Sequence, residues 1–408
     1  MRKEKFMPEG TAIYIVQRGD TVDSIAAGYG VSTETIVRDN QIIYPYELAL
    51  GQALFIDLGT RQPYRSLRVS GYAYPYINET VLADTLPYLS ELAIFSYGFT
   101  TAGELVPPAL PDDWMIAMAL QNGTEPILTL TPLDDQGRFS NYLIHSVVQN
   151  QETINLLIDN LLEVMTEKGY LGVDIDFEYI LAEDRDAFTD FVWQVAERMR
   201  LSGYHTSVAL APKTSADQKG VLYEGKDYRA LGEAADHVLL MTYEWGYTYG
   251  PPMAVAPLNQ VRRVVEYAVT EIPPQKIDLG IPNYGYDWPL PFVRGETQAT
   301  SIGNLQAVRI AIEQGVPIRF DDASQSPFFT YVLAGNNAPE EGGGGNAVVA
   351  QGNIAAIMHE VWFEDVRSYQ GKFDLIREFE LGGCGYWQIM RWFAANWKLL
   401  YKNFYIEK

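Results

Sequence analysis

The chain has 408 residues, 47% of them hydrophobic and 13% aromatic, which is enough for one large folded domain and a small one. Its formal net charge of -22 argues against nucleic acid or an anionic membrane surface as a partner. A single cysteine, Cys384, excludes a disulfide framework and a cysteine-based zinc site. The four histidines show no metal-ligand spacing, so the sequence predicts no metal and no other cofactor.

The N-terminal segment carries positive charge without an apolar stretch behind it, which is not the pattern of a secretory signal peptide. No stretch approaches the roughly 20 apolar residues of a membrane helix. We therefore expect a protein that is made in the cytoplasm and is not conventionally exported. We also expect a monomer.

Residues 12–57 predict a small unit of two strands and two helices. Asp20 or Thr21 can cap the first helix, and Ser32 or Thr33 can cap the second. The predicted elements are a strand at 12–16, a helix at 22–28, a helix reaching about residue 39, and a strand at 50–56.

A short polar linker at 58–67 is followed by alternating strand and helix signals. Eight strands with helices between them predict an α/β fold, a (β/α)8 TIM barrel over 68–400. An open doubly wound sheet is the alternative, but no glycine-rich phosphate loop follows the first strand. The predicted strands are 68–73, 92–97, 126–131, 172–178, 206–211, 237–243, 276–282 and 382–389.

The interval 292–360 is too long for a barrel loop. It contains a helix signal at 304–314, strand signals near 318–320 and 328–333, and the glycine-rich run 342–345, for which we expect mobility. The sequence therefore predicts a small α+β insertion between strands seven and eight.

Three carboxylates stand at every second position, at Asp174, Asp176 and Glu178, with large apolar residues between them. Because side chains alternate along a strand, the acids must share one face. Crowding and desolvation disfavour their ionised forms. Such an arrangement indicates a carboxyl group whose proton is available near neutral pH.

Chemistry in such barrels takes place at the C-terminal ends of the strands, where this chain places several polar and aromatic side chains. A pocket of acids, Trp and Tyr is suited to grip a sugar and to protonate its glycosidic oxygen. The alternative is that Tyr243 and Trp387 are core aromatics and that Asn283 and Tyr284 only form a turn. The predicted site residues are Glu178, Tyr72, Tyr97, Met241, Tyr243, Glu244, Trp245, Asn283, Tyr284 and Trp387.

The small N-terminal unit resembles a LysM module, because Gly-Asp-Thr stands at 19–21, Asn follows the second helix and Gly-Gln precedes the last strand. The resemblance implies binding of glycans that contain N-acetylglucosamine, in a groove between loops 19–23 and 40–46. A degenerate module that is only a spacer is the alternative. The implied binding residues are Gly19, Asp20, Thr21, Asn40 and Ile43.

The domain from about 68 to 398 resembles glycoside hydrolase family 18. The acids 174, 176 and 178 match the last three of the motif Asp-x-x-Asp-x-Asp-x-Glu, with Leu171 at its first position. Met-x-Tyr-Asp occurs as Met-Thr-Tyr-Glu at 241–244, and Trp387 matches the Trp of strand eight. A strand-three Ser-x-Gly-Gly is absent. Stretches at 250–254, 282–288 and 360–365 resemble the LysM-bearing spore cortex-lytic glucosaminidases.

This resemblance implies a retaining, substrate-assisted hydrolase that cleaves N-acetylglucosaminyl bonds in spore-cortex peptidoglycan. Glu178 would be the general acid, Asp176 would orient the acetamido group above Asp174, and Tyr243 would donate to its oxygen. Trp387 would form the floor of the sugar-binding pocket, and the LysM module would anchor the enzyme to the glycan. The protein would enter spore layers from the mother-cell cytoplasm. A chitinase and a non-catalytic sugar-binding protein are the alternatives, although retention of Glu178 counts against the latter.

Overall fold

The computed structural model of the chain describes residues 7–134, 136–333 and 356–408. At the N-terminus it shows the predicted βααβ unit, whose two strands pair antiparallel. The hydroxyl of Thr21 caps the first helix and that of Ser32 caps the second. Gly30, at φ 67°, ends the first helix in the left-handed conformation that glycine adopts readily. The elements are β1 (Thr11–Ile15), α1 (Val22–Tyr29), α2 (Thr33–Asp39) and β2 (Ala53–Asp57).

Eight parallel strands form a closed barrel, in which the first strand pairs with both the second and the last. This confirms the predicted barrel. A short strand, β5 (Leu105–Val106), forms a hairpin with β4, and β17 (Tyr405–Ile406) runs beside β3. The barrel strands are β3 (Ser66–Ala73), β4 (Glu91–Phe99), β6 (Glu125–Leu130), β7 (Gly172–Ile175), β8 (His205–Leu210), β9 (His237–Leu240), β10 (Ile277–Pro282) and β16 (Gly383–Trp387).

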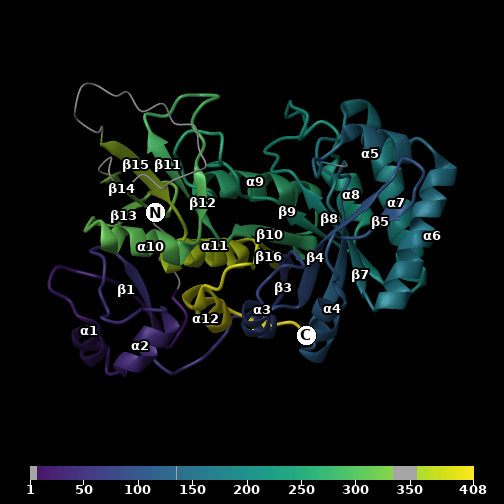
Figure 1. Cartoon of the computed structure of the whole chain (residues 1–408). Coiled ribbons are helices and arrows are strands. Elements are labelled where there is room, and N and C mark those ends of the chain that lie inside the picture. The colour runs from purple at the N-terminus through teal and green to yellow at the C-terminus, as the bar shows by residue number, and fades with distance from the viewer. Residues whose placement is uncertain (1–6, 135, 334–355) are drawn as a thin grey trace.

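Helices surround the barrel, and the main hydrophobic core lies between them and the strands (Figure 1). Phe177 illustrates this layer, because its ring lies 5.6 Å from the rings of both Phe188 and Phe191 on the helix that follows. The helices are α3 (Glu79–Thr85), α4 (Asp113–Gln121), α5 (Asn141–Val148), α6 (Gln151–Lys168), α7 (Arg185–Leu201), α8 (Tyr228–Ala234), α9 (Leu258–Glu271), α11 (Val366–Glu378) and α12 (Ala394–Asn403).

The predicted α+β insertion between barrel strands seven and eight is a five-stranded sheet in the order β12-β11-β15-β14-β13 with one helix. Its own core includes Phe329, Val361 and Phe363. The glycine-rich run 342–345 lies outside the described residues. The elements are β11 (Gly285–Leu290), β12 (Thr300–Ile302), α10 (Asn304–Glu313), β13 (Arg319–Asp321), β14 (Ser326–Leu333) and β15 (Ile357–Trp362).

The LysM unit lies against both the insertion and the barrel, on the side opposite α5, α6 and α7 (Figure 1). Phe55 of β2 is fully buried within the main barrel core. The backbone amide of Ile318 donates to the carbonyl oxygen of Leu50 at 2.8 Å, and that of Ala394 to Gln41 Oε1 at 2.7 Å. The unit is therefore docked on the rest of the molecule along a continuous contact.

Several barrel strands end earlier than the sequence predicts, and β7 and β9 differ most. β7 stops at Ile175 and β9 at Leu240, whereas strands 172–178 and 237–243 were predicted. After β9 the amide of Tyr243 donates to the carbonyl oxygen of Met241 at 2.9 Å, a local bond that turns the chain away from the sheet. No helix among the described residues is both long and apolar enough to cross a membrane.

Candidate active site

Asp174 lies on β7 with its side chain inside the barrel, and it is almost fully buried. One carboxylate oxygen accepts from the Ser207 hydroxyl at 2.6 Å and the other from the Tyr72 hydroxyl at 2.9 Å. Burial raises the pKa of Asp174, and the two hydroxyl donors oppose that shift. The hydroxyl groups of Ser207 and Tyr72 therefore hold the carboxyl group of Asp174 in place.

Asp176 follows the end of β7 and is also buried, with its backbone amide bonded to Leu130 at 3.0 Å. Its Oδ1 atom is buried without a hydrogen-bond partner among the described residues. Burial raises its pKa well above the ordinary value, and the neighbouring Glu178 and Asp174 raise it further. A buried acceptor that no described residue satisfies is suited to receive a polar group from a ligand.

Glu178 is half-buried at the mouth of the barrel, and burial raises its pKa. The positive charge of Lys226 opposes this rise. Lys226 is itself 1% exposed, and its ammonium group donates to the carbonyl oxygen of Ala209 at 3.0 Å. No motif in the sequence indicates this lysine, because it stands some 50 residues after the acids in a loop without a recognisable pattern.

Aromatic rings surround Trp387, which is half-buried at the end of β16. Its ring centroid lies 5.7 Å from that of Tyr72, 5.1 Å from Phe95 and 6.2 Å from Tyr74. The exposed Tyr76 stacks on Tyr74 at 5.2 Å. Sequence reasoning found Tyr72 and Trp387 but missed the other three, although alternation along 72–76 could have indicated Tyr74.

Tyr243 lies at the turn after β9, close to the acids. Burial raises the pKa of its hydroxyl group well above the ordinary value, as do Asp176 and Glu178, so the group keeps its proton as a donor. Met241 packs into the same cluster of side chains as Tyr72 and Trp387 inside the barrel. The structure therefore brings the predicted Tyr243, Met241 and Trp387 together.

Glu244 is held by two tyrosines from the start of the insertion. The hydroxyl of Tyr284 donates to its Oε1, and that of Tyr286 lies 3.1 Å from the same atom. Glu244 has a positive φ of 65°, a left-handed backbone conformation that is uncommon for a residue other than glycine. Trp245 is half-buried and packs against the main barrel core.

Two predicted substrate-binding residues have structural roles instead. A register shift in β4 between Ile94 and Tyr97 reverses the alternation, so Tyr97 points outward and its hydroxyl donates to Asp112 at 3.1 Å. Phe95, which lies two residues earlier, keeps the inward position that the alternation predicts. Asn283 is 2% exposed, and its amide donates to the carbonyl oxygen of Arg391 at 2.8 Å. It braces the loop after β16 and has no free face for a sugar.

Three of the predicted LysM residues likewise maintain the fold. Asn40 is buried and exchanges hydrogen bonds with the backbone of Phe55 at 2.7 and 2.8 Å. Asp20 accepts from the Tyr14 hydroxyl at 2.7 Å, and Thr21 caps α1. Gly19 is an exposed turn residue with φ 90°.

Ile43, by contrast, is 59% exposed and lines a cavity of about 230 Å³. One wall of this cavity is the loop 40–47 of the LysM unit, and the other is α10 of the insertion. The predicted groove instead had the loop 19–23 as its second wall, and that loop does not line this cavity.

Comparison with known proteins places the chain in a family. The model of glycosyl hydrolases family 18 matches residues 136–391, and that of the LysM domain matches 14–57. The cortical fragment-lytic enzyme of Bacillus subtilis (strain 168) is 36% identical over 97% of this chain and 99% of its own. The enzyme of the same name from Bacillus anthracis is 37% identical over the same shares.

Solved structures agree with these matches. The Bacillus cereus spore cortex-lytic enzyme SleL matches with a TM-score of 0.87 at 33% identity, over 98% of this chain and 99% of its own. A chitinase from Chromobacterium violaceum matches with a TM-score of 0.72 at 24% identity, over 83% of this chain and 98% of its own, which supports the fold alone.

The chain belongs to family 18 of the glycosyl hydrolases and is a glycosidase with an N-terminal LysM domain. Over nearly its whole length it is similar to spore cortex-lytic enzymes.

Proposed function

We propose that this protein hydrolyses N-acetylglucosaminyl bonds in spore-cortex peptidoglycan by a retaining, substrate-assisted mechanism. The observation that carries the proposal is the stack of three acids at the end of β7, each with a different environment. Asp174 is held by two hydroxyls, Asp176 has a free buried oxygen, and Glu178 is half-open to solvent.

Glu178 acts as the general acid. Burial raises its pKa, which favours a protonated carboxyl group that can deliver its proton to the leaving glycosidic oxygen. The resulting carboxylate then activates a water molecule for the second half of the reaction. No second protein carboxylate attacks the sugar, because family 18 departs from the two-carboxylate scheme.

The substrate's own acetamido oxygen attacks the anomeric carbon and forms a cyclic oxazolinium intermediate. Asp176 accepts the acetamido N–H on its partnerless Oδ1 and stabilises the positive charge that develops there. Residues i and i+2 lie about 6.5 Å apart along an extended chain, so Asp176 reaches the acetamido group while Glu178 reaches the bond that breaks. Tyr243 donates its hydroxyl to the acetamido oxygen, and Trp387 forms the floor.

Peptidoglycan is favoured over chitin by the similarity to two enzymes named for cortical fragments and to a spore cortex-lytic enzyme. Binding of the glycan by the LysM domain, through the cavity at Ile43, would hold the enzyme on the polymer. We infer that it acts in the cortex and coat layers of the spore.

Product analysis tests this function. The full-length chain is incubated in parallel with purified cortex fragments and with chitin oligomers, and the new reducing ends are identified by mass spectrometry. We expect cortex fragments with N-acetylglucosamine at the new reducing end and much slower turnover of chitin. Faster cleavage of chitin would support the chitinase alternative, and no cleavage of either glycan would support the sugar-binding one.

A further inference from the structure

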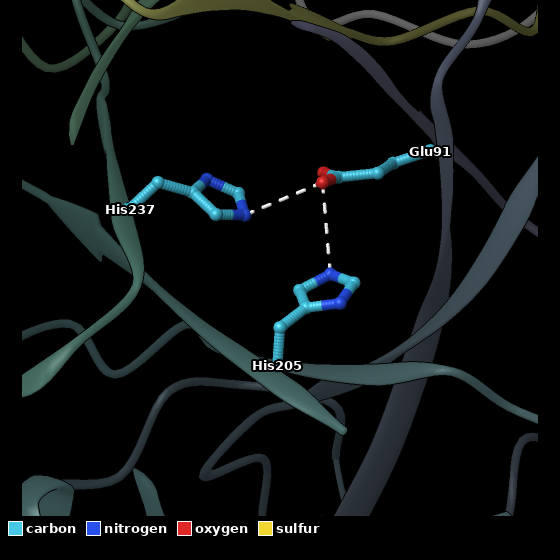
Figure 2. A group of neighbouring side chains, drawn as sticks. All are labelled: Glu91, His205 and His237. Atoms are coloured by element: carbon cyan, nitrogen blue, oxygen red, sulfur yellow. Dashed lines mark ion pairs between the residues drawn. The ribbon is translucent and has the colours of Figure 1, made fainter. Parts of the chain in front are cut away.

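A second cluster of ionisable side chains lies at the opposite end of the barrel from the three acids. Glu91, His205 and His237 are the first residues of β4, β8 and β9, and their side chains converge (Figure 2). One carboxylate oxygen, Glu91 Oε1, lies 3.4 Å from His237 Nε2 and 3.6 Å from His205 Nε2. The family chemistry uses none of these three residues.

These contacts are too long for ordinary N–H···O hydrogen bonds, which measure about 2.7–3.2 Å. Both Nε2 atoms are buried without a hydrogen-bond partner among the described residues, and the His237 side chain is only 7% exposed. Ligands about 2.0–2.1 Å from a tetrahedral Zn²⁺ ion stand about 3.3–3.4 Å from one another. The observed separations from Glu91 are close to that spacing, and all three ligand atoms lie within 4.8 Å of one another.

A carboxylate behind the His237 ring orients it toward the centre of the cluster, and a second carboxylate lies behind the His205 ring. His237 Nδ1 lies 2.7 Å from Asp278 Oδ2, within hydrogen-bond distance, whereas His205 Nδ1 has only a longer ion-pair contact of 3.6 Å with Glu125 Oε2. A proton on Nδ1 that faces a carboxylate leaves the lone pair of Nε2 free to bind a cation. This carboxylate–histidine arrangement is a regular feature of zinc sites.

The charge of the surroundings also suits a dication. Glu91, Glu125 and Asp278 are three carboxylates, and the guanidinium of Arg68, 2.7 Å from Asp278, offsets one of them. With neutral imidazoles, two negative charges remain in excess.

We propose that Glu91, His205 and His237 bind a divalent cation of the zinc type at the base of the barrel, with water as a fourth ligand. Two imidazoles and one carboxylate form a donor set that Zn²⁺ accepts. The ion would join β4, β8 and β9 where they begin, far from the reacting sugar, so its role is to stabilise the fold. The His205 side chain is 24% exposed and provides the route of entry.

The competing occupant is a proton on His237. Burial lowers the pKa of His237, but Glu91 and Asp278 outweigh that effect and raise the pKa to about 10. An imidazolium between two carboxylates would satisfy the same charges without a metal. The experiment must therefore distinguish a bound ion from a bound proton.

Zinc binding by the full-length protein tests the proposal. Protein stripped with a chelator is titrated with Zn²⁺ against a chromophoric chelator, and thermal unfolding is followed with and without Zn²⁺. We expect one ion per chain and a Tm that rises with Zn²⁺ concentration. His205→Gln and His237→Gln should each weaken binding by more than about 100-fold and abolish the shift in Tm.

His145→Gln is the matched control, because His145 Nδ1 also lies 2.8 Å from a buried aspartate, Asp184, but His145 belongs to no such cluster among the described residues. It should bind Zn²⁺ like the wild type. If His237→Gln does not fold, the more exposed His205→Gln decides the outcome. A folded wild-type chain that binds no Zn²⁺, or unchanged binding and Tm shift in His205→Gln, would overturn the proposal and leave the imidazolium as the occupant.

Discussion

The ionisation of Glu178 depends on two opposed influences from its neighbours. Burial favours the neutral carboxyl group, whereas the buried cation of Lys226 favours the carboxylate. Burial outweighs Lys226 and the pKa is raised, which suits a general acid, since such a group works best when its pKa lies near the working pH. Both residues can be tested separately.

Replacement of Glu178 by Gln should remove nearly all activity and leave the fold intact. The amide keeps the shape of the side chain but has no proton to deliver, and such catalysis contributes roughly 10²–10⁴-fold to the rate. The measurement is kcat on soluble cortex fragments, with circular dichroism as the test of folding. A folded variant that keeps more than about a hundredth of the wild-type kcat would contradict the assigned role.

Replacement of Lys226 by Met should shift the pH dependence of kcat. Because the cation lowers the pKa of Glu178, its loss raises that pKa, and the acid stays protonated to higher pH. The alkaline limb of the profile should therefore move to higher pH. Lys276→Met is the control, since the Lys276 ammonium group also binds backbone carbonyls, those of Gly232 and Ala235, away from the acids. A limb that stays in place, or moves equally in both variants, would exclude electrostatic coupling.

The local sequence predicts which way the acids face, because apolar and acidic side chains alternate strictly from Val173 to Phe177. It cannot predict Lys226, whose position depends on how a distant loop folds back. It is wrong for Tyr97, because one register shift in β4 reverses the alternation there. For Asn40, the module motif indicated a glycan ligand where the structure shows a backbone brace.

The outward-facing Tyr97 belongs to a polar network that joins β4, α4 and α6. Asp112 at the start of α4 accepts from Tyr97 at 3.1 Å and from Tyr170 at 2.6 Å, and it pairs with the ammonium group of Lys168. Burial raises the pKa of Asp112, but these donors outweigh it and lower the pKa below the ordinary value. The charged form of Asp112 therefore stabilises the folded state.

Replacement of Asp112 by Asn should lower the free energy of unfolding at neutral pH by about 2–4 kcal/mol. A lowered pKa contributes stability above the unfolded-state value of about 3.9, and this contribution is lost as the pH falls through the folded-state value. The difference between wild type and variant should thus be smaller at about pH 3 than at neutral pH. Urea unfolding at both pH values measures it, and an equal difference at both would contradict the ionised network.

The order of the strands and helices was predictable because the hydrophobic residues of each barrel element recur with a clear period. The eight strand signals all correspond to barrel strands, and the helix predicted at 304–314 is α10. The ends of β7 and β9 were not predictable, since the alternation of side chains continues past the last strand residue; after β9 a local turn replaces the sheet.

The LysM domain is packed on the barrel and contributes to its core, so it does more than anchor the enzyme to a glycan. Phe55 of the domain is part of the barrel core, so removal of the domain would expose apolar surface on the barrel. Gly51 has φ 79°, and a Cβ atom there would lie 2.0 Å from the carbonyl oxygen of Ile318 in the insertion. Glycan binding is therefore better tested by surface substitutions than by deletion.

Ile43→Ser and Tyr44→Ser should weaken binding to insoluble cortex peptidoglycan by about tenfold or more, because both exposed side chains line the cavity beside α10. Turnover of short soluble fragments should not change. Leu201→Ser, at an 80% exposed position on α7, is the control. Co-sedimentation of the Ile43 variant equal to that of the wild type would show that this cavity is not the glycan site.

The claim that the substrate supplies its own nucleophile is tested most directly by varying the acetamido group. A series of aryl glycosides carrying N-acetyl, fluoroacetyl, difluoroacetyl and trifluoroacetyl groups changes the electron density on the attacking oxygen and little else. If that oxygen attacks in the transition state, kcat/KM should fall steeply with each added fluorine. A kcat/KM that does not depend on fluorination, together with a covalent sugar adduct on Asp174 or Asp176 in the intact mass, would contradict the mechanism.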